Sequence, residues 1–196
     1  MIVWINGAFG SGKTGIAFEL SKRLPGSFVF DPENFGYYLQ KSLPKFLQTD
    51  DFQDEPLWRD VNYMMLKKLS SEHSGHIIVP MTVTSGQYRD ELIGKLRQDG
   101  VRVDHYLLEA SRKTLQKRLK KRFEGNRSWS VLQIDRCLNT FEASFFEGRI
   151  QTDNMSFTEI TDFIGKQSAL DLIADNESKL RKRLSHFMNQ IRHIKI

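Results

Sequence analysis

The residues best suited to chemistry lie in one stretch near the start of the chain, Gly7-Ala8-Phe9-Gly10-Ser11-Gly12-Lys13-Thr14. Its spacing matches G-x-x-x-x-G-K-[ST], and it stands between the apolar run 1–5 and a segment with helical spacing of apolar residues. Glycines let backbone N–H groups surround an anion, and a helix start adds a positive dipole end. In this pattern Lys13 reaches the β- and γ-phosphates, and the Thr14 hydroxyl binds Mg²⁺. The stretch predicts a site for ATP and Mg²⁺, with a plain glycine turn and exposed lysine as the alternative.

Composition sets limits on the class of protein. The 196 residues are 39% hydrophobic, which suits one globular domain, 1–196. The lone Cys137 favours a reducing compartment, and no Cys/His spacing indicates a zinc site. No apolar run is long enough to span a membrane. Because the first predicted strand begins almost at Met1, we expect no signal peptide. We therefore expect a cytoplasmic protein.

The net charge of +5 is unevenly distributed. Residues 112–127 hold eight Lys or Arg and one acid, and residues 179–196 hold six and no acid. These two stretches carry +7 + 6 = +13, so the rest of the chain carries −8. Local basic patches can meet phosphates, nucleic acid or anionic lipid. Because no nucleic-acid motif accompanies them, nucleic acid is not an expected partner.

Strand and helix patterns alternate along the chain. Apolar runs predict strands at 1–5, 27–30, 76–80, 101–108 and 148–152. Helices are expected to begin at Lys13, Pro56, Ser111, Ser128 or Ser130, and Ser156, and two more are expected before Gly100 and over 177–195. The helix from Pro56 has an expected apolar face of Leu57, Val61, Met64, Met65 and Leu69. Residues 33–55 are expected to be an irregular or weakly helical insert. This alternation predicts an α/β fold with a parallel sheet and helices on both faces, whose ligands bind at the carboxyl ends of the strands.

The motifs together resemble the kinase branch of the P-loop NTPases, of the nucleoside monophosphate kinase type, and more narrowly the ATP-binding tunicamycin resistance proteins of bacilli. The segments that carry the resemblance are 4–14, 56–59, 78–82, 133–137 and 150–154. The resemblance implies a five-stranded parallel sheet of order 2-3-1-4-5, a substrate region after the second strand, and a lid at about 120–130.

The resemblance also implies roles for particular residues. Asp31, at the end of the second strand, would take the proton of the acceptor hydroxyl or help to hold Mg²⁺; a turn residue before Pro32 is the alternative, and Glu33 is a weaker candidate. Arg118 and Arg122 share one helix face and would contact adenine and phosphates, and Arg127 would close as a lid arginine on the transferring phosphate. A solvated basic face is the alternative for these arginines.

Further residues are assigned by the same resemblance. Trp58 and Arg59 would bind the acceptor, unless they are a core aromatic and a surface ion pair. Asp153 and Asn154, after Thr152, would cup the adenine, unless they cap the next helix. Arg136 is a further candidate for a phosphate contact.

One departure from the pattern concerns the third strand, 76–80, which ends without the usual Walker-B aspartate. The leading hypothesis is an ATP- and Mg²⁺-dependent kinase that phosphorylates a small molecule, such as a nucleoside antibiotic. The alternative is a protein that binds ATP and sequesters the antibiotic without transferring phosphate.

The last predicted helix, 177–195, combines an apolar stripe with six basic residues. Such a helix packs on its own domain or on the second subunit of a homodimer, or it lies on an anionic membrane surface. We expect packing, with peripheral membrane contact as the alternative.

Overall fold

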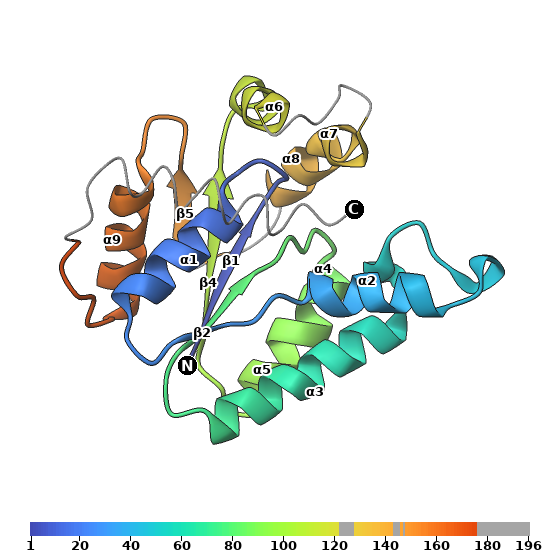
Figure 1. Ribbon diagram of the computed structural model, residues 1–196, viewed down its shortest axis with the longest axis horizontal. Helices are drawn as coiled ribbons and strands as arrows, with labels where there is room; N and C mark the ends of the chain where they lie inside the picture. The colour runs from blue at the N-terminus through green and yellow to red at the C-terminus, as the bar shows by residue number, and fades with distance from the viewer. Residues whose placement is uncertain (122–127, 143–145, 147, 176–196) are drawn as a thin grey trace.

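The computed structural model describes residues 1–121, 128–142, 146 and 148–175, and the fold is a sheet between helical layers (Figure 1). The five strands are β1 (Ile2–Gly7), β2 (Phe28–Val29), β3 (Ile77–Pro80), β4 (Val103–Glu109) and β5 (Gly148–Gln151). They lie in the order β2-β3-β1-β4-β5, and all four pairings are parallel. The predicted fold class and strand order are therefore confirmed.

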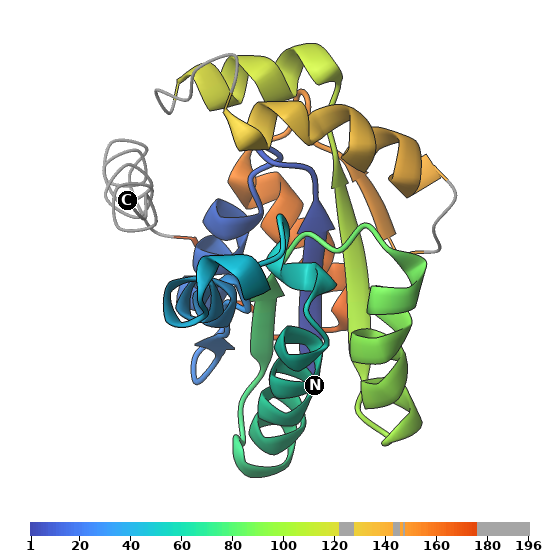
Figure 2. The same cartoon turned by 90° about the vertical axis from the view of Figure 1, so that its right-hand side faces the viewer.

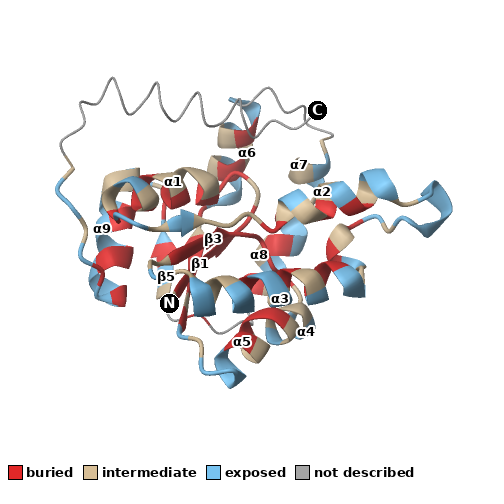
Figure 3. Ribbon diagram, turned by 60° about the horizontal axis from the view of Figure 1, so that its bottom comes forward, coloured by how far each residue is buried: buried red, intermediate tan, exposed pale blue. Residues whose placement is uncertain are grey.

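Both faces of the sheet are covered by helices, as predicted. One face packs on α1 (Lys13–Arg23) and α9 (Phe157–Ser168), and the other packs on α3 (Pro56–Glu72), the π-helix η3 (Asp90–Gly94) and α5 (Lys95–Gln98) (Figure 1). Side chains of a strand alternate between faces. Val3 and Ile5 accordingly meet the α1 side, while Ile2 and Trp4 meet the α3 side. Because β1 is central, all six of its residues are buried (Figure 3).

A third helical group lies over the carboxyl ends of the strands, where the arrowheads point in Figure 2. It contains α6 (Arg112–Lys120), α7 (Trp129–Leu132) and α8 (Ile134–Glu142). Leu115 and Leu119 of α6 and Ile134 of α8 pack with Leu107 of β4 and with Ala8 of the loop after β1. This group therefore places the basic helix beside the glycine-rich loop.

The segment after β2 is more regular than the sequence predicts. It forms α2 (Glu33–Ser42), the short 3₁₀ turns η1 (Lys45–Leu47) and η2 (Phe52–Asp54), and then α3; the remaining short helix is α4 (Gly86–Arg89). The ring of Phe52 packs so close to Gly36 that a Cβ there would lie 2.5 Å from it. Packing of η2 against α2 thus orders a region whose local propensity is weak.

The predicted apolar face of α3 is correct only in part, because Leu69 packs against the core but Leu57, Met64 and Met65 are exposed. The helix buries Trp58, Arg59, Asn62 and Leu66, and leaves Leu57, Met64 and Met65 42–56% exposed. Indole, guanidinium and amide groups can be buried where each finds a hydrogen-bond partner, which apolar periodicity alone does not reveal. The predicted terminal helix, 177–195, and most of the predicted lid lie outside the described residues.

Candidate nucleotide-binding site

The loop between β1 and α1 has the backbone shape that its glycines predict. Gly7, Gly10 and Gly12 have φ values of 151°, 84° and 106°, and residues that carry a Cβ rarely adopt such backbone angles. A Cβ on Gly7 would also lie 2.6 Å from Ser11 Oγ and 2.8 Å from the Leu108 carbonyl. The loop can therefore fold back on itself only with glycine at these places.

Lys13 lies inside this loop. Its Nζ donates to the carbonyls of Gly7 (3.0 Å) and Ala8 (3.2 Å), and the residue is 8% exposed. The N-cap of α1, Gly12, supplies no side-chain cap, and the first turn of the helix carries no acid. A buried ammonium therefore stands beside uncapped N–H groups at a positive dipole end, which is the chemistry that a phosphate requires.

A buried asparagine joins the loop to the segment after β3. Asn6 Oδ1 accepts hydrogen bonds from the N–H groups of Gly7 (2.8 Å) and Val83 (3.1 Å). Its Nδ2 donates to the Val83 carbonyl (2.9 Å) and to His105 Nε2 (3.1 Å). Both donors and both acceptor positions of the amide are thus used. Sequence reasoning missed Asn6, although a polar residue at the end of an apolar strand was a visible signal.

His105 lies behind the loop and is 1% exposed. Because the Asn6 amide donates to Nε2, this ring nitrogen is the acceptor and the proton resides on Nδ1. Burial, with a smaller contribution from the positive charges of Arg97 and Arg89, lowers the pKa of His105 from 6.5 to about 3. The imidazole is therefore neutral and acts as a fixed hydrogen-bond acceptor.

Asp31 follows β2 at the same edge of the sheet as the loop. Its Oδ1 accepts a hydrogen bond from the Glu33 N–H (3.0 Å) at the start of α2, and Glu33 itself accepts from Tyr37 Oη (3.5 Å). This is the local geometry that a turn residue before Pro32 would have. The carboxylate is nevertheless at the predicted edge, so its role toward an acceptor stays a prediction.

Trp58 and Arg59, predicted to bind the acceptor, instead hold together the segment that follows β2. Trp58 is fully buried, and its Nε1 donates to the Pro32 carbonyl (3.1 Å). Arg59 is 6% exposed, pairs with Glu91 and donates to the Gln53 carbonyl of η2, both at 2.5 Å. Trp58 is therefore a core aromatic residue, which was the alternative to acceptor binding. Arg59 forms an ion pair, as its alternative expected, but this pair is buried and does not lie on the surface.

Arg118 connects the predicted nucleotide elements. Its Nη1 donates to the Ser11 carbonyl and to Thr152 Oγ1, both at 3.1 Å, and its Nη2 donates to the Thr152 carbonyl (2.7 Å). The guanidinium thus joins the glycine loop to the turn after β5. The structure thus brings Arg118 and this turn together; the predicted contact of Arg118 with adenine or phosphates stays a prediction, and Arg122 and Arg127 lie outside the described residues.

Asp153 supports the start of a helix, but not of the predicted one. Its carboxylate accepts hydrogen bonds from the N–H and Oγ of Ser111, the N-cap of α6, and from Oγ1 of Thr114, whereas Ser156 and Glu159 form a capping box on α9. These hydrogen bonds lower the pKa of Asp153. Asn154 beside it is exposed. A role for either residue at an adenine stays a prediction.

Asp51 is a buried carboxylate that sequence reasoning did not select. It accepts from the Gln53 N–H (3.0 Å) and lies 3.5 Å from Arg136 of α8. Burial raises the pKa of the Asp51 carboxyl, and Arg136 opposes that effect.

Cys137 is a buried thiol of α8. Burial raises the pKa of this thiol, and the positive charges of Lys13 and Arg136 oppose that effect only in part. Asp51, Arg136 and Lys13 are thus all close enough to influence one thiol beneath the loop.

A cavity of about 310 Å³ opens at the carboxyl ends of β4 and β5. Its wall includes Ala8 of the glycine loop, Ser111 and Asp153.

Within the described part of the chain, no group of three or more His, Cys, Asp or Glu side chains could hold a metal ion. In the same ranges, no helix combines the length and apolar character that crossing a bilayer requires.

The sheet order and the glycine loop with its enclosed lysine define a P-loop protein with a kinase-like fold. The AAA domain family matches residues 2–144. The chain is 32% identical to the tunicamycin resistance protein of Deinococcus radiodurans; the match covers 89% of this chain and 98% of that one, with a TM-score of 0.75. The chain belongs to the AAA domain family and to the tunicamycin resistance proteins.

More distant structures share the fold. A sugar kinase from Janibacter sp. is 22% identical, with a TM-score of 0.63 and coverage of 86% of this chain and 94% of that one. A gluconokinase from Sinorhizobium meliloti is 16% identical, with a TM-score of 0.57 and coverage of 95% of both chains. No curated protein matches the sequence. Fold, loop and family together indicate an ATP-binding, kinase-like P-loop protein.

Proposed function

We propose that the protein is an ATP- and Mg²⁺-dependent phosphotransferase that acts on a small molecule, such as a nucleoside antibiotic. The observation that carries this proposal is Lys13 Nζ enclosed by the glycine loop, with the carboxylate of Asp31 two strands away at the same edge of the sheet. The name of the Deinococcus protein, a tunicamycin resistance protein, supports an antibiotic as the acceptor.

The residues of the loop would do most of the binding. Its N–H groups and Lys13 would hold the β- and γ-phosphates, and Thr14 would hold Mg²⁺, which neutralises charge on the phosphates when bound. Asp31 would accept the proton of the acceptor hydroxyl. Arg118 already lies between the loop and Thr152, which suits a residue next to the bound nucleotide. Arg127 remains the predicted lid arginine.

An assay with purified protein tests this function. The protein is incubated with ATP, Mg²⁺ and candidate acceptors, and acceptor-dependent ADP and phosphorylated product are measured. Lys13→Ala should abolish ATP binding and transfer, whereas Asp31→Asn should keep ATP binding and lose transfer by about a hundredfold or more. Asp162→Asn, on the exposed surface of α9, is the matched control. Undiminished turnover of Asp31→Asn would remove that residue from its proposed role.

A second function is supported by the end of β3. The strand ends at Pro80 and continues as Met81-Thr82-Val83, so no carboxylate stands at the usual Walker-B position. The protein would then bind ATP and sequester the antibiotic without transferring phosphate. Saturable tunicamycin binding that requires ATP, with no phosphorylated product after many hours, would favour this function over the first.

A further inference from the structure

The carbonyl of Gly7 accepts two hydrogen bonds. One comes from Lys13 Nζ (3.0 Å) and the other from Thr82 Oγ1 (2.8 Å). Gly7 is buried, and Thr82 is 2% exposed. The carbonyl therefore depends on these protein donors, because a buried polar group without a partner costs free energy.

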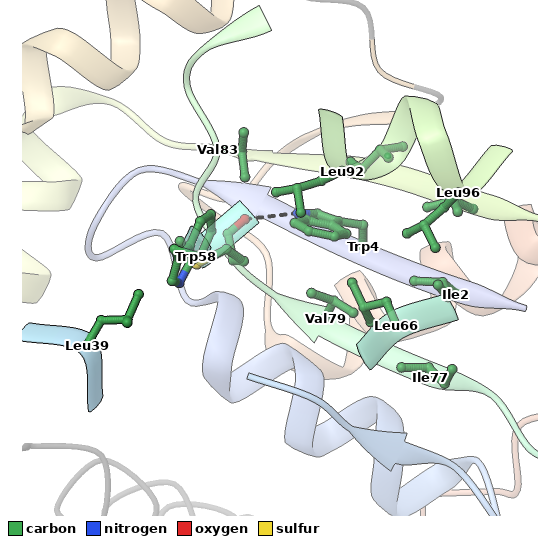
Figure 4. Packing of buried hydrophobic residues seen from close by; sticks show 13 residues of the cluster. Ile2, Trp4, Leu39, Trp58, Leu66, Ile77, Val79, Val83, Leu92 and Leu96 are labelled. Atoms are coloured by element: carbon green, nitrogen blue, oxygen red, sulfur yellow. Dashed lines mark hydrogen bonds between the residues drawn. The ribbon is translucent and has the colours of Figure 1, made fainter. Parts of the chain in front are cut away.

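Thr82 is held in place independently of Lys13. The Met81 N–H donates to the Ile5 carbonyl, and Trp4 Nε1 donates to the Met81 carbonyl, both at 3.1 Å; Figure 4 shows the second bond. On the other side, both main-chain groups of Val83 are bonded to the Asn6 amide. Threonine at 82 thus lies between two residues that are fixed to β1, and its hydroxyl has a defined position.

We propose that Thr82 is a positioning residue of the nucleotide site, which keeps the Gly7 carbonyl hydrogen-bonded when Lys13 turns to the phosphates. The inference rests on the proposed binding of ATP. A P-loop lysine that reaches the β- and γ-phosphates must divide its three N–H donors between them and the loop carbonyls. The Thr82 hydroxyl remains on Gly7, so that buried carbonyl stays hydrogen-bonded however Lys13 divides its donors.

The same chemistry accounts for the missing acid after β3. An ionised aspartate at position 82 would have no proton to donate, and its negative charge would face the Gly7 carbonyl. Threonine has a donor and is small enough to be buried there. The departure from the Walker-B pattern is thus matched to the hydrogen bond that the loop needs at this place.

Titration calorimetry with Mg·ATP tests the proposal. Thr82→Val keeps the shape but removes the donor, so in the complex the Gly7 carbonyl would have to compete with the phosphates for the donors of Lys13. We expect ATP affinity to fall about five- to a hundredfold. Thr82→Ser should bind within about twofold of the natural protein, since it keeps the hydroxyl. Thr161→Val is the matched control, because that buried hydroxyl on α9 has no partner among the described residues. Unchanged ATP affinity of Thr82→Val would overturn the proposal.

A second measurement needs no nucleotide. Thr82→Val and Lys13→Met each leave one donor on the Gly7 carbonyl, whereas the double variant leaves none. In urea unfolding, the double variant should therefore lose more stability than the two single variants together. Additive losses would overturn the two-donor arrangement. Absence of ATP binding by the natural protein would instead refute the proposed function, whichever way the unfolding cycle turns out.

Discussion

Replacing His105 by glutamine tests whether one buried imidazole makes the fold sensitive to acid. The ring is 1% exposed, lies 4.6 Å from the Phe146 ring between centroids, and accepts a hydrogen bond from Asn6. Burial lowers its pKa from 6.5 to about 3. The folded protein therefore binds this proton less readily than the unfolded chain does.

The sign and size of the effect follow from this difference. A folded-state pKa below the unfolded value gives stability that is present above pH 6.5 and is lost as the pH falls toward 3. Between pH 7.5 and pH 5 the unfolded state gains protonation that the folded state does not. The free energy of unfolding should fall by about 2 kcal/mol from His105 alone, which is a factor of about 30 in the folding equilibrium.

The assay is urea unfolding of both proteins at pH 7.5 and at pH 5. Glutamine offers an amide acceptor in place of the ring nitrogen but takes up no proton. We expect His105→Gln to be less stable at pH 7.5 because the ring contacts are lost. Its loss of stability on acidification should be smaller than that of the natural protein by about 2 kcal/mol. An equal loss in both proteins would refute the assignment of a neutral, buried His105.

Three further variants test the loop and its supports. Gly7→Ala should abolish ATP binding in calorimetry and lower stability by about 2 kcal/mol or more, because a Cβ collides with the loop at this positive φ. Arg118→Ala should weaken ATP binding about tenfold in the same assay, because the loop loses its tie to Thr152. Arg59→Met should lower the free energy of unfolding by about 2 kcal/mol in urea, since it strands partly buried Glu91 and the Gln53 carbonyl.

Controls accompany these variants. Gly86→Ala, where an added Cβ meets no atom within 4 Å, should leave ATP binding intact. Arg102→Ala removes a more exposed ion pair with Asp104, so it should cost less stability than Arg59→Met. Natural ATP affinity in Gly7→Ala or Arg118→Ala, or natural stability in Arg59→Met, would contradict the corresponding contact.

Local patterns were sufficient to predict a parallel α/β sheet, whereas the strand order came from the resemblance to a known family. Continuous apolar runs predicted β1 and β3 as buried parallel strands, and the glycine spacing after β1 predicted a phosphate loop with its helix. Both signals lie within short segments, where backbone preference and side-chain periodicity act directly. The length of the strands was less predictable: β2 has two residues where four were expected, because its pairing with β3 covers only those two.

What the sequence alone determined is therefore the P-loop, the parallel sheet and the family. The tertiary structure decided which face of α3 is buried and that Arg59 donates a hydrogen bond to the η2 turn. It also decided that Asn6, Thr82 and His105 support the loop. Those roles arise from hydrogen bonds between residues that are far apart in the chain. A buried polar side chain is stable only beside its partner, and no local spacing records which partner that is.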